Sequence, residues 1–308
     1  MNRSTWIASG GATLFAGFAR ESLAQSLTVL DVAYAGSMGS MMEGPIKSTA
    51  ASALGIDMHG RAQGSDALAK LIVGGSINAD VFIPVTPGPA MTVLKAGKAQ
   101  SAAPIARTEM VIAYSPKSKY AEQFAEAASG KRGAMPWYEV LQQPRVRFGR
   151  TDPATDPQGR NIIFTFQLAE AYYKQPGLVQ KVLGDTVNTA QIFSEPTVEA
   201  RLQSGELDAA SAYKIQPGPF NVPYINLPDQ INLGNESMHD AYQRASLTLS
   251  DKTYHPEALV YYAAVITGSA HADKATAFVD WLSSAGGQAI FKKYAYDPPV
   301  GAIALSEK

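Results

Sequence analysis

Two serines stand directly after glycine where a predicted strand turns into a predicted helix. They are Ser37, after Gly36, and Ser65, after Gly64. The first turn of a helix leaves backbone N–H groups without intrahelical partners, and a hydroxyl there either caps the helix or donates to a ligand oxygen. The two turns together therefore indicate a site for a small oxyanion, with N–H and O–H groups as donors.

A turn-rich loop, residues 149–160, brings Asp156 to the start of a third predicted helix. Aspartate before a proline such as Pro157 is an ordinary N-cap. A free carboxylate repels a dianion, so Asp156 contributes to an anion site only by ligating the anion's central metal, by being protonated, or by orienting other donors. Arg160 either neutralises this carboxylate, faces the ligand or lies in solvent. The residues alone leave both roles of Asp156 open.

Tyr213 lies at the end of a predicted strand, in the segment 211–214. Its hydroxyl is a neutral donor on a rigid aromatic stem, which suits an anion site. The alternative is that the ring only packs in a hinge. Lys214 beside it suits a solvated charge better than a ligand.

Signals for an enzyme are weak. The four histidines are scattered and form no HExxH motif or paired metal spacing. Around Ser37, Ala35 occupies the position at which a nucleophile elbow has its first glycine. Because P-loop and dinucleotide motifs are absent as well, we predict a binding protein with no cofactor and no resident metal. A small-ligand hydrolase that uses Ser37 is the alternative from another class.

The composition limits the classes of partner that the chain can bind. The 308-residue chain has a net charge of −1 and no basic stripe, so nucleic acid and anionic membranes are poor candidates. It has no cysteine, which excludes disulfides, thiolate metal sites and a cysteine-linked lipid anchor. We expect a monomer.

Residues 1–24 have the pattern of a secretory signal. Arg3 precedes a weakly apolar run, residues 6–19, and Ser22-Leu23-Ala24 provides a small-x-small cleavage site. This run is too short to span a membrane. We therefore predict export to a bacterial periplasm, with Gln25 as the first residue of the mature, soluble chain.

Short β-branched runs alternate with helical patterns along the rest of the chain, which predicts α/β architecture. The predicted strands are 27–34, 57–62, 79–84, 108–115, 146–149, 189–193, 209–214, 244–248 and 258–266. The predicted helices are 39–54, kinked or delayed at Pro45, then 66–73 capped by Ser65, 89–95, 120–128, 137–141, 161–173, 177–183, 197–204, 273–284 and 287–294.

Two extended stretches, 108–115 and 211–227, lie on either side of a central block. A chain that crosses to a second lobe and returns leaves a cleft in which strand ends and helix N-termini meet. One continuous sheet is the alternative.

Several of these segments resemble the substrate-binding proteins of molybdate/tungstate ABC transporters, in particular the branch typified by the archaeal proteins. The matching segments are residues 35–37, 64–65, the Asp-Pro-x-x-Asp-Pro-x-Gly loop at 152–159, 205–208 with Tyr213-Lys214, 224–232 and 276–294. The resemblance implies a two-lobe type II periplasmic-binding-protein fold with two crossover strands and an interlobe cleft. Lobe I would comprise 25–108 plus 225–308, and lobe II 109–224.

The same resemblance implies high-affinity binding of a tetrahedral oxyanion, molybdate or tungstate, for delivery to an ABC permease. Ser37, Ser65, Tyr213, Asp156 and backbone N–H groups would hold it. In that branch a glutamate just before the tyrosine also approaches the metal, but Ala212 stands here. We therefore predict four-coordinate binding, or five-coordinate binding if Asp156 ligates the oxyanion's metal. Receptors for sulfate, phosphate or another oxyanion remain alternatives.

Overall fold

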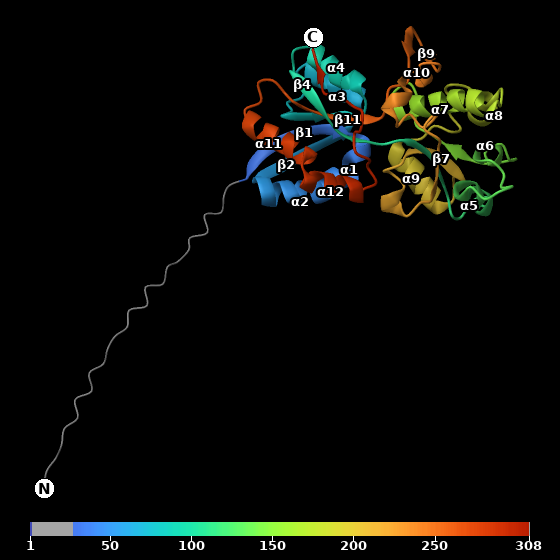
Figure 1. The fold of residues 1–308 in the computed structure, drawn as a ribbon, viewed down its shortest axis with the longest axis horizontal. Helices are drawn as coiled ribbons and strands as arrows, with labels where there is room; N and C mark the ends of the chain where they lie inside the picture. Colours follow the sequence, from blue (N-terminus) through green and yellow to red (C-terminus); the bar gives the residue numbers. More distant parts are fainter. Residues whose placement is uncertain (2–26, 308) are drawn as a thin grey trace.

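The computed structural model describes Met1 and residues 27–307, and two separate sheets organise it (Figure 1). A six-stranded sheet has the order β12-β4-β11-β3-β1-β2, and a four-stranded sheet has the order β6-β7-β5-β8. We call the parts built around them the six-stranded half and the four-stranded half. The predicted signal sequence lies outside the described residues, apart from Met1.

The six-stranded sheet draws its strands from both ends of the chain. It contains β1 (Thr28–Ala35), β2 (Ile56–Gln63), β3 (Val81–Ile83), β4 (Ser101–Arg107), β11 (Val260–Val265) and β12 (Leu305–Ser306). Strand β1 pairs in parallel with β2 and β3, whereas β11 is antiparallel to β3 and β4. The carboxyl ends of β1 and β2 therefore lie together at one edge, where the Gly36 and Gly64 turns begin.

Helices cover this sheet on both sides (Figure 1). They are α3 (Ser65–Val73), α4 (Pro87–Lys95), α11 (Ala272–Ser283) and α12 (Ala285–Lys293). A run of short helical segments follows β1, namely η1 (Gly36–Met38), α1 (Gly39–Met41), η2 (Met42–Ile46), α2 (Lys47–Thr49) and η3 (Ala50–Leu54). The predicted kink at Pro45 is confirmed, because Gly44 before it has non-helical angles of φ −99° and ψ −106°.

The four-stranded half is built from the central part of the chain. Its strands are β5 (Met110–Tyr114), β6 (Phe148–Gly149), β7 (Ala209–Tyr213) and β8 (Tyr224–Asn226). Its helices are α5 (Ala121–Ser129), α6 (Trp137–Val140), α7 (Pro157–Tyr173), α8 (Leu178–Leu183) and α9 (Glu195–Ser204). Helices α7 and α9 lie on opposite sides of β7 in Figure 1.

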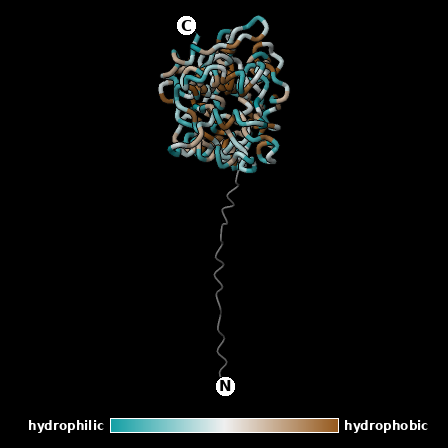
Figure 2. Tube along the Cα trace, turned by 90° about the vertical axis from the view of Figure 1, so that its right-hand side faces the viewer, coloured by the Kyte–Doolittle hydropathy of each residue, from teal (hydrophilic) through white to brown (hydrophobic). Residues whose placement is uncertain are grey.

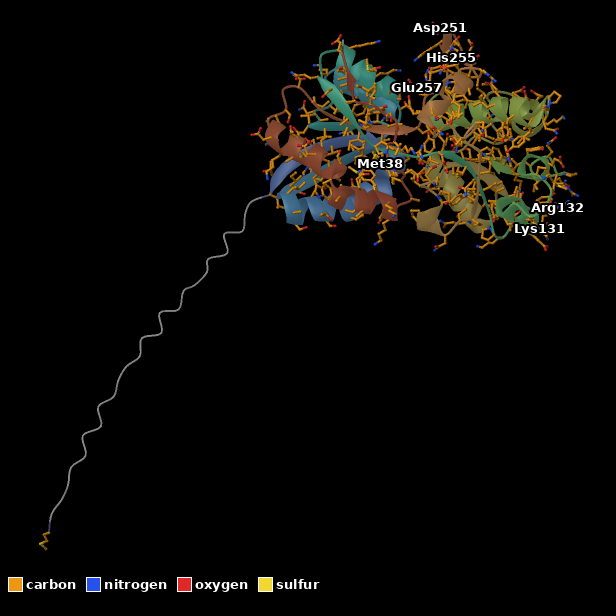
Figure 3. All side chains as sticks on the ribbon, in the orientation of Figure 1. Met38, Lys131, Arg132, Asp251, His255 and Glu257 are labelled. Carbon is orange, nitrogen blue, oxygen red and sulfur yellow. The ribbon has the colours of Figure 1, made fainter. Side chains whose placement is uncertain are left out.

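A small outer module lies beside α7 (Figure 1). It contains α10 (His239–Tyr242) and the hairpin of β9 (Leu247–Leu249) with β10 (Lys252–Tyr254). Asp251 marks the tip of this hairpin in Figure 3. Two further 3₁₀ segments are η4 (Gly218–Phe220) and η5 (Glu236–Met238).

Two sequence predictions are wrong, and one strand was not predicted. Strand β4 was not expected, because its sequence SAAPIAR is poor in β-branched residues and contains Pro104. The predicted strand 189–193 forms only an isolated bridge between Arg150 and Ile192. Ser65 does not cap α3, since Gly64 is the N-cap and Ser65 is the first helical residue.

Buried apolar side chains form a large cluster, with two smaller clusters beside it. In Figure 2 hydrophilic segments follow much of the outline of the molecule. Among the described residues, no helix combines the length and apolar character that crossing a bilayer requires.

Candidate ligand-binding cavity

A cavity of about 380 Å³ lies between the two halves, and it brings all four predicted site residues together. Ser37 and Ser65 come from the six-stranded half, whereas Asp156 and Tyr213 come from the four-stranded half. The residues are far apart in the sequence, so only the folded chain makes them neighbours.

Ser37 lies in the first turn after β1, where the predicted choice was between cap and ligand donor. No side chain caps the 3₁₀ turn Gly36–Met38. The Ser37 hydroxyl instead lies 2.9 Å from the hydroxyl of Tyr261, a fully buried residue of β11. Tyr261 therefore fixes the direction of the Ser37 side chain at the wall of the cavity.

Ser65 is almost fully buried and begins α3. Its oxygen accepts a hydrogen bond of 3.1 Å from the backbone N–H of Val85. A hydroxyl that accepts in this way still has its own proton to donate. The N–H groups of the first turn of α3 also lack intrahelical acceptors, so this corner offers several donors at once.

Asp156 caps helix α7 and also lines the cavity, whereas its role toward a ligand stays a prediction. Its Oδ1 caps α7 by accepting from the N–H of Gln158 at 2.8 Å, and the same side chain lines the cavity. Burial raises the pKa of Asp156, against the opposing effects of the Gln158 bond and the charge of Arg160. The cap uses the first available N–H of α7, because Pro157 has none.

Gly159 explains why the Asp-Pro loop ends in glycine. A Cβ atom at this position would lie 2.5 Å from the carbonyl oxygen of Thr151 and 2.7 Å from the nitrogen of Pro153. Both are backbone atoms, so they cannot move aside as a side chain would. The loop folds back on the first turn of α7, and this close approach positions Asp156.

Tyr213 is buried at the end of β7. Its hydroxyl oxygen accepts from the side-chain amide of Asn161 at 3.0 Å, and its backbone N–H donates to Gln216 at 2.6 Å. Burial raises the pKa of Tyr213 well above its ordinary value, so the phenol stays neutral. Within the described residues its hydroxyl donates to no acceptor, which leaves a donor at the cavity wall.

Two carboxylates of the cavity were not among the predicted site residues. Glu195 is the first residue of α9, and Glu199 lies one turn further along the same helix. Burial, followed by the charge of Asp156, raises the pKa of Glu195 to about 7, and burial raises that of Glu199 to about 7. A signal was present, because Glu195-Pro196 repeats the acid-proline helix start of Asp156-Pro157.

No lysine, arginine or histidine is among the described residues that line the cavity. Lys131 and Arg132 lie at the outer edge of the four-stranded half, far from Met38 beside Ser37 (Figure 3). Across the described part of the chain, no group of three or more His, Cys, Asp or Glu residues has metal-binding geometry. The donors of the cavity are therefore neutral hydroxyl, amide and backbone groups.

The two halves also contact each other beside the cavity. Arg160, on α7, donates to the carboxylate of Asp66 on α3 at 2.7 Å. A Cβ atom at Gly64 would lie 3.9 Å from the carbonyl oxygen of Thr155, and one at Gly36 would lie 3.7 Å from Oε2 of Glu195. Gly64 and Gly36 of the six-stranded half therefore lie close to Thr155 and Glu195 of the four-stranded half.

The molybdate/tungstate-binding protein WtpA of Pyrococcus abyssi is 32% identical over 219 residues, which are 63% of this chain and 62% of that one. The match thus spans less than two thirds of the relative's length.

Solved structures share the fold. The periplasmic molybdate-binding protein of Azotobacter vinelandii superposes with a TM-score of 0.60 at 17% identity, covering 88% of this chain and 99% of that one. The sulfate-binding protein SubI of Mycobacterium tuberculosis gives 0.62 at 13% identity, covering 89% and 88%. The architecture is accordingly the α/β type II periplasmic-binding-protein fold, as predicted.

A family model described as bacterial extracellular solute-binding protein matches residues 30–297. This match covers nearly all of the described chain, including both halves and every wall of the cavity. The chain belongs to the bacterial extracellular solute-binding protein family.

Proposed function

We propose that the chain is a receptor that binds a tetrahedral oxyanion, molybdate or tungstate, in the cavity between its two halves. The observation that carries this proposal is the convergence of Ser37, Ser65 and Tyr213 on one cavity. Ser65 and Tyr213 each present a hydroxyl whose oxygen already accepts a hydrogen bond, so that the proton is available to an anion oxygen. Either hydroxyl of the Ser37–Tyr261 pair can be the donor to the other, which leaves one proton of the pair unused between them. The name of the Pyrococcus relative supports the choice of molybdate or tungstate.

Asp156 is the fourth proposed ligand-binding residue. Its Oδ1 accepts the capping hydrogen bond and the side chain lines the cavity, so Oδ2 would be the oxygen that approaches the anion's central metal. The residue directly before Tyr213 is Ala212, which has no carboxylate to act as a second ligand of the metal. Four-coordinate binding, or five-coordinate binding with Asp156, remains our prediction.

The lobes of this receptor would be residues 25–108 plus 225–308, and residues 109–224. The strand composition of the two sheets supports the division, because β1–β4, β11 and β12 belong to one and β5–β8 to the other. Strand β8 begins at Tyr224 and pairs with β5, so the return to the first lobe would lie just beyond it.

The receptor would be a periplasmic monomer that delivers its anion to an ABC permease after removal of residues 1–24. Membership of an extracellular solute-binding family supports this location. A hydrolase is disfavoured because the Ser37 hydroxyl pairs with Tyr261 instead of a base. Burial raises the pKa of that tyrosine, so it does not accept a proton near neutral pH.

A protonated oxyanion such as hydrogen phosphate is the second candidate ligand. The carboxylates of Asp156, Glu195 and Glu199 favour it, because an ionised carboxylate accepts the proton of such an anion. Molybdate, tungstate and sulfate are fully deprotonated near neutral pH, so they require only hydrogen-bond donors from the protein.

Calorimetric titration of the ligand-stripped protein tests the proposal. Molybdate, tungstate, sulfate and phosphate are titrated separately, in a buffer that contains none of them. We expect binding of molybdate or tungstate, and an increase in unfolding free energy of about 2.7 kcal/mol at a ligand concentration one hundred times Kd. The absence of both signals for both anions would contradict the proposed function.

A further inference from the structure

Gln216 is a buried residue just after β7 that joins three elements of the cavity wall. Its Oε1 accepts a hydrogen bond from the backbone N–H of Tyr213 at 2.6 Å and another from the side-chain amide of Gln158 at 2.5 Å. Its own side-chain amide donates to the carboxylate of Glu195. The end of β7, the first turn of α7 and the start of α9 are therefore held together by one side chain, which is 7% exposed.

The partners of Gln216 allow only one orientation of its amide group. A backbone N–H only donates, so the Gln216 atom that lies 2.6 Å from the nitrogen of Tyr213 is the carbonyl oxygen. The amide nitrogen then lies at the other end, where the Glu195 carboxylate accepts its proton. Reversal of the amide would place two donors against each other at Tyr213, which is costly in a buried position.

The orientation of Gln158 follows from that of Gln216. The Gln158 atom that lies 2.5 Å from the carbonyl oxygen of Gln216 is the donor Nε2, because an oxygen there would bring two acceptors into contact. Oε1 is therefore the free end of the Gln158 amide. Among the described residues, no group donates a hydrogen bond to Oε1.

Gln158 lies in the first turn of α7 and lines the cavity. The residue is 4% exposed, so its oxygen has little access to water. A nearly buried acceptor without a donor is unfavourable unless a ligand supplies the donor. The carboxyl groups of Asp156 and Glu199 become donors when they bind a proton, whereas the amide oxygen of Gln158 accepts at every pH.

We propose that Gln158 is a specificity-determining residue whose Oε1 accepts a hydrogen bond from the proton of a singly protonated tetrahedral oxyanion, such as hydrogen phosphate. The inference rests on the proposed function, since it requires an oxyanion in this cavity, and it assigns an acceptor to the second candidate ligand. The proton stays on the anion. Sulfate has the same shape and charge but no proton, so Gln158 sets the affinity for hydrogen phosphate relative to sulfate. Molybdate also lacks a proton and binds without this contact.

Calorimetry on the ligand-stripped wild type tests the inference with phosphate and sulfate at about pH 8, where both are mainly dianions. We expect hydrogen phosphate to bind about 5- to 150-fold more tightly than sulfate, because only phosphate supplies the donor for a buried acceptor. Molybdate is titrated in parallel to show that the cavity is functional. Sulfate binding that equals or exceeds phosphate binding would overturn the proposal.

Gln158→Met removes the acceptor and keeps a side chain of similar length. We expect the preference for hydrogen phosphate over sulfate to disappear, while Kd for molybdate changes by less than about twofold. A general distortion of the cavity would instead weaken the binding of all three anions. If Gln158→Met does not fold, Gln158→Ala replaces it, and the comparison of phosphate with sulfate on the wild type needs no variant.

Gln167→Met is the matched control, because it changes the same type of residue in the same helix. Both ends of the Gln167 amide bond to the backbone of Ser246, which is not among the residues that line the cavity. We expect this variant to keep the wild-type preference. An unchanged preference in Gln158→Met, or an equal loss in Gln167→Met, would contradict the role of Gln158.

The same titrations separate the failure of this inference from that of the proposed function. If molybdate binds but hydrogen phosphate shows no preference over sulfate, only the role of Gln158 fails. If none of the three anions binds to the wild type, the proposed function fails and this inference with it.

Discussion

Arg160 and Asp66 join the two halves of the molecule by a 2.7 Å hydrogen-bonded ion pair. Arg160 also donates to the carbonyl of Pro153 in its own half and lies over the ring of Tyr254, in the outer module, at 4.5 Å. Its side chain is 8% exposed, whereas that of Asp66 is 41% exposed. Separation of the halves would return Asp66 to water and leave Arg160 with its remaining contacts.

We predict that Asp66→Asn weakens oxyanion binding modestly. The pair is partly exposed, so its loss should destabilise the form in which the two halves are in contact by only about 0.2–1 kcal/mol. Kd should rise by a factor of about 1.5 to 5, and the difference should shrink at high salt. Calorimetry at two ionic strengths measures both effects.

Asp273→Asn is the control for this prediction. Asp273 lies in the first turn of α11, as Asp66 does in α3, so both changes remove the same favourable interaction with a helix N-terminus. We expect no change in Kd for the control. Equal effects of the two substitutions would show that the contact between the halves does not contribute to binding.

Ser65→Ala and Ser37→Ala should each weaken molybdate binding by about 1–3 kcal/mol, because a buried anion oxygen loses a donor. Both variants should also lose stability, because Ser65→Ala leaves the N–H of Val85 without its side-chain partner and Ser37→Ala does the same to the fully buried hydroxyl of Tyr261. Calorimetry and thermal melts measure the two effects, with Ser52→Ala on the exposed face of η3 as the control. Wild-type affinity in both site variants would mean that the anion binds elsewhere.

The sequence was most informative where a local pattern decides the structure. Glycine followed by a small polar residue located both serine turns, and the acid-proline pair located the start of α7. Sequence reasoning failed where a feature depends on residues that are distant in the sequence. The place of β4 between β12 and β11, and the hydrogen bond between the Ser65 hydroxyl and the N–H of Val85, both depend on segments that are distant in the sequence.

Glu195 was missed for the same reason. Its helix was predicted to begin two residues later, so the residue was read as part of a loop and never considered as a wall of the site. Its position in the cavity depends on Gln216, which follows β7 and lies 21 residues further along the chain.

Gly159→Ala should destabilise the Asp-Pro loop. Alanine gains up to about 1 kcal/mol of helix propensity, but the Cβ contact of 2.5 Å with the Thr151 carbonyl forces the backbone to shift. Overpacking of this kind costs about 1–3 kcal/mol. We expect a lower Tm and, because Asp156 moves with the loop, weaker binding. Gly218→Ala, where no neighbouring atom lies within 4 Å of the Cβ position, should leave Tm nearly unchanged.

The buried carboxylate of Asp208 should make stability depend on acidity. Asp208 accepts from the Arg147 guanidinium at 2.9 and 3.0 Å and from the Ser118 hydroxyl at 2.7 Å. Burial alone would raise its pKa, but the bonds from Arg147 and Ser118 outweigh burial and the pKa is lowered. The folded state therefore holds the proton less tightly than the unfolded state, and the stabilisation is present above the unfolded pKa of about 3.9 and lost as pH falls below it.

Asp208→Asn should remove this dependence and lower the unfolding free energy at neutral pH by about 1–3 kcal/mol, since an amide satisfies the Arg147 donors poorly. Urea denaturation of the wild type and of Asp208→Asn at several pH values between about 7 and 3 measures the unfolding free energy of each. The two curves of unfolding free energy against pH should converge in acid. Asp251→Asn, at the exposed hairpin tip in Figure 3, should follow the wild-type curve throughout. Parallel curves for Asp208→Asn and wild type would show that the lowered pKa of Asp208 does not stabilise the fold.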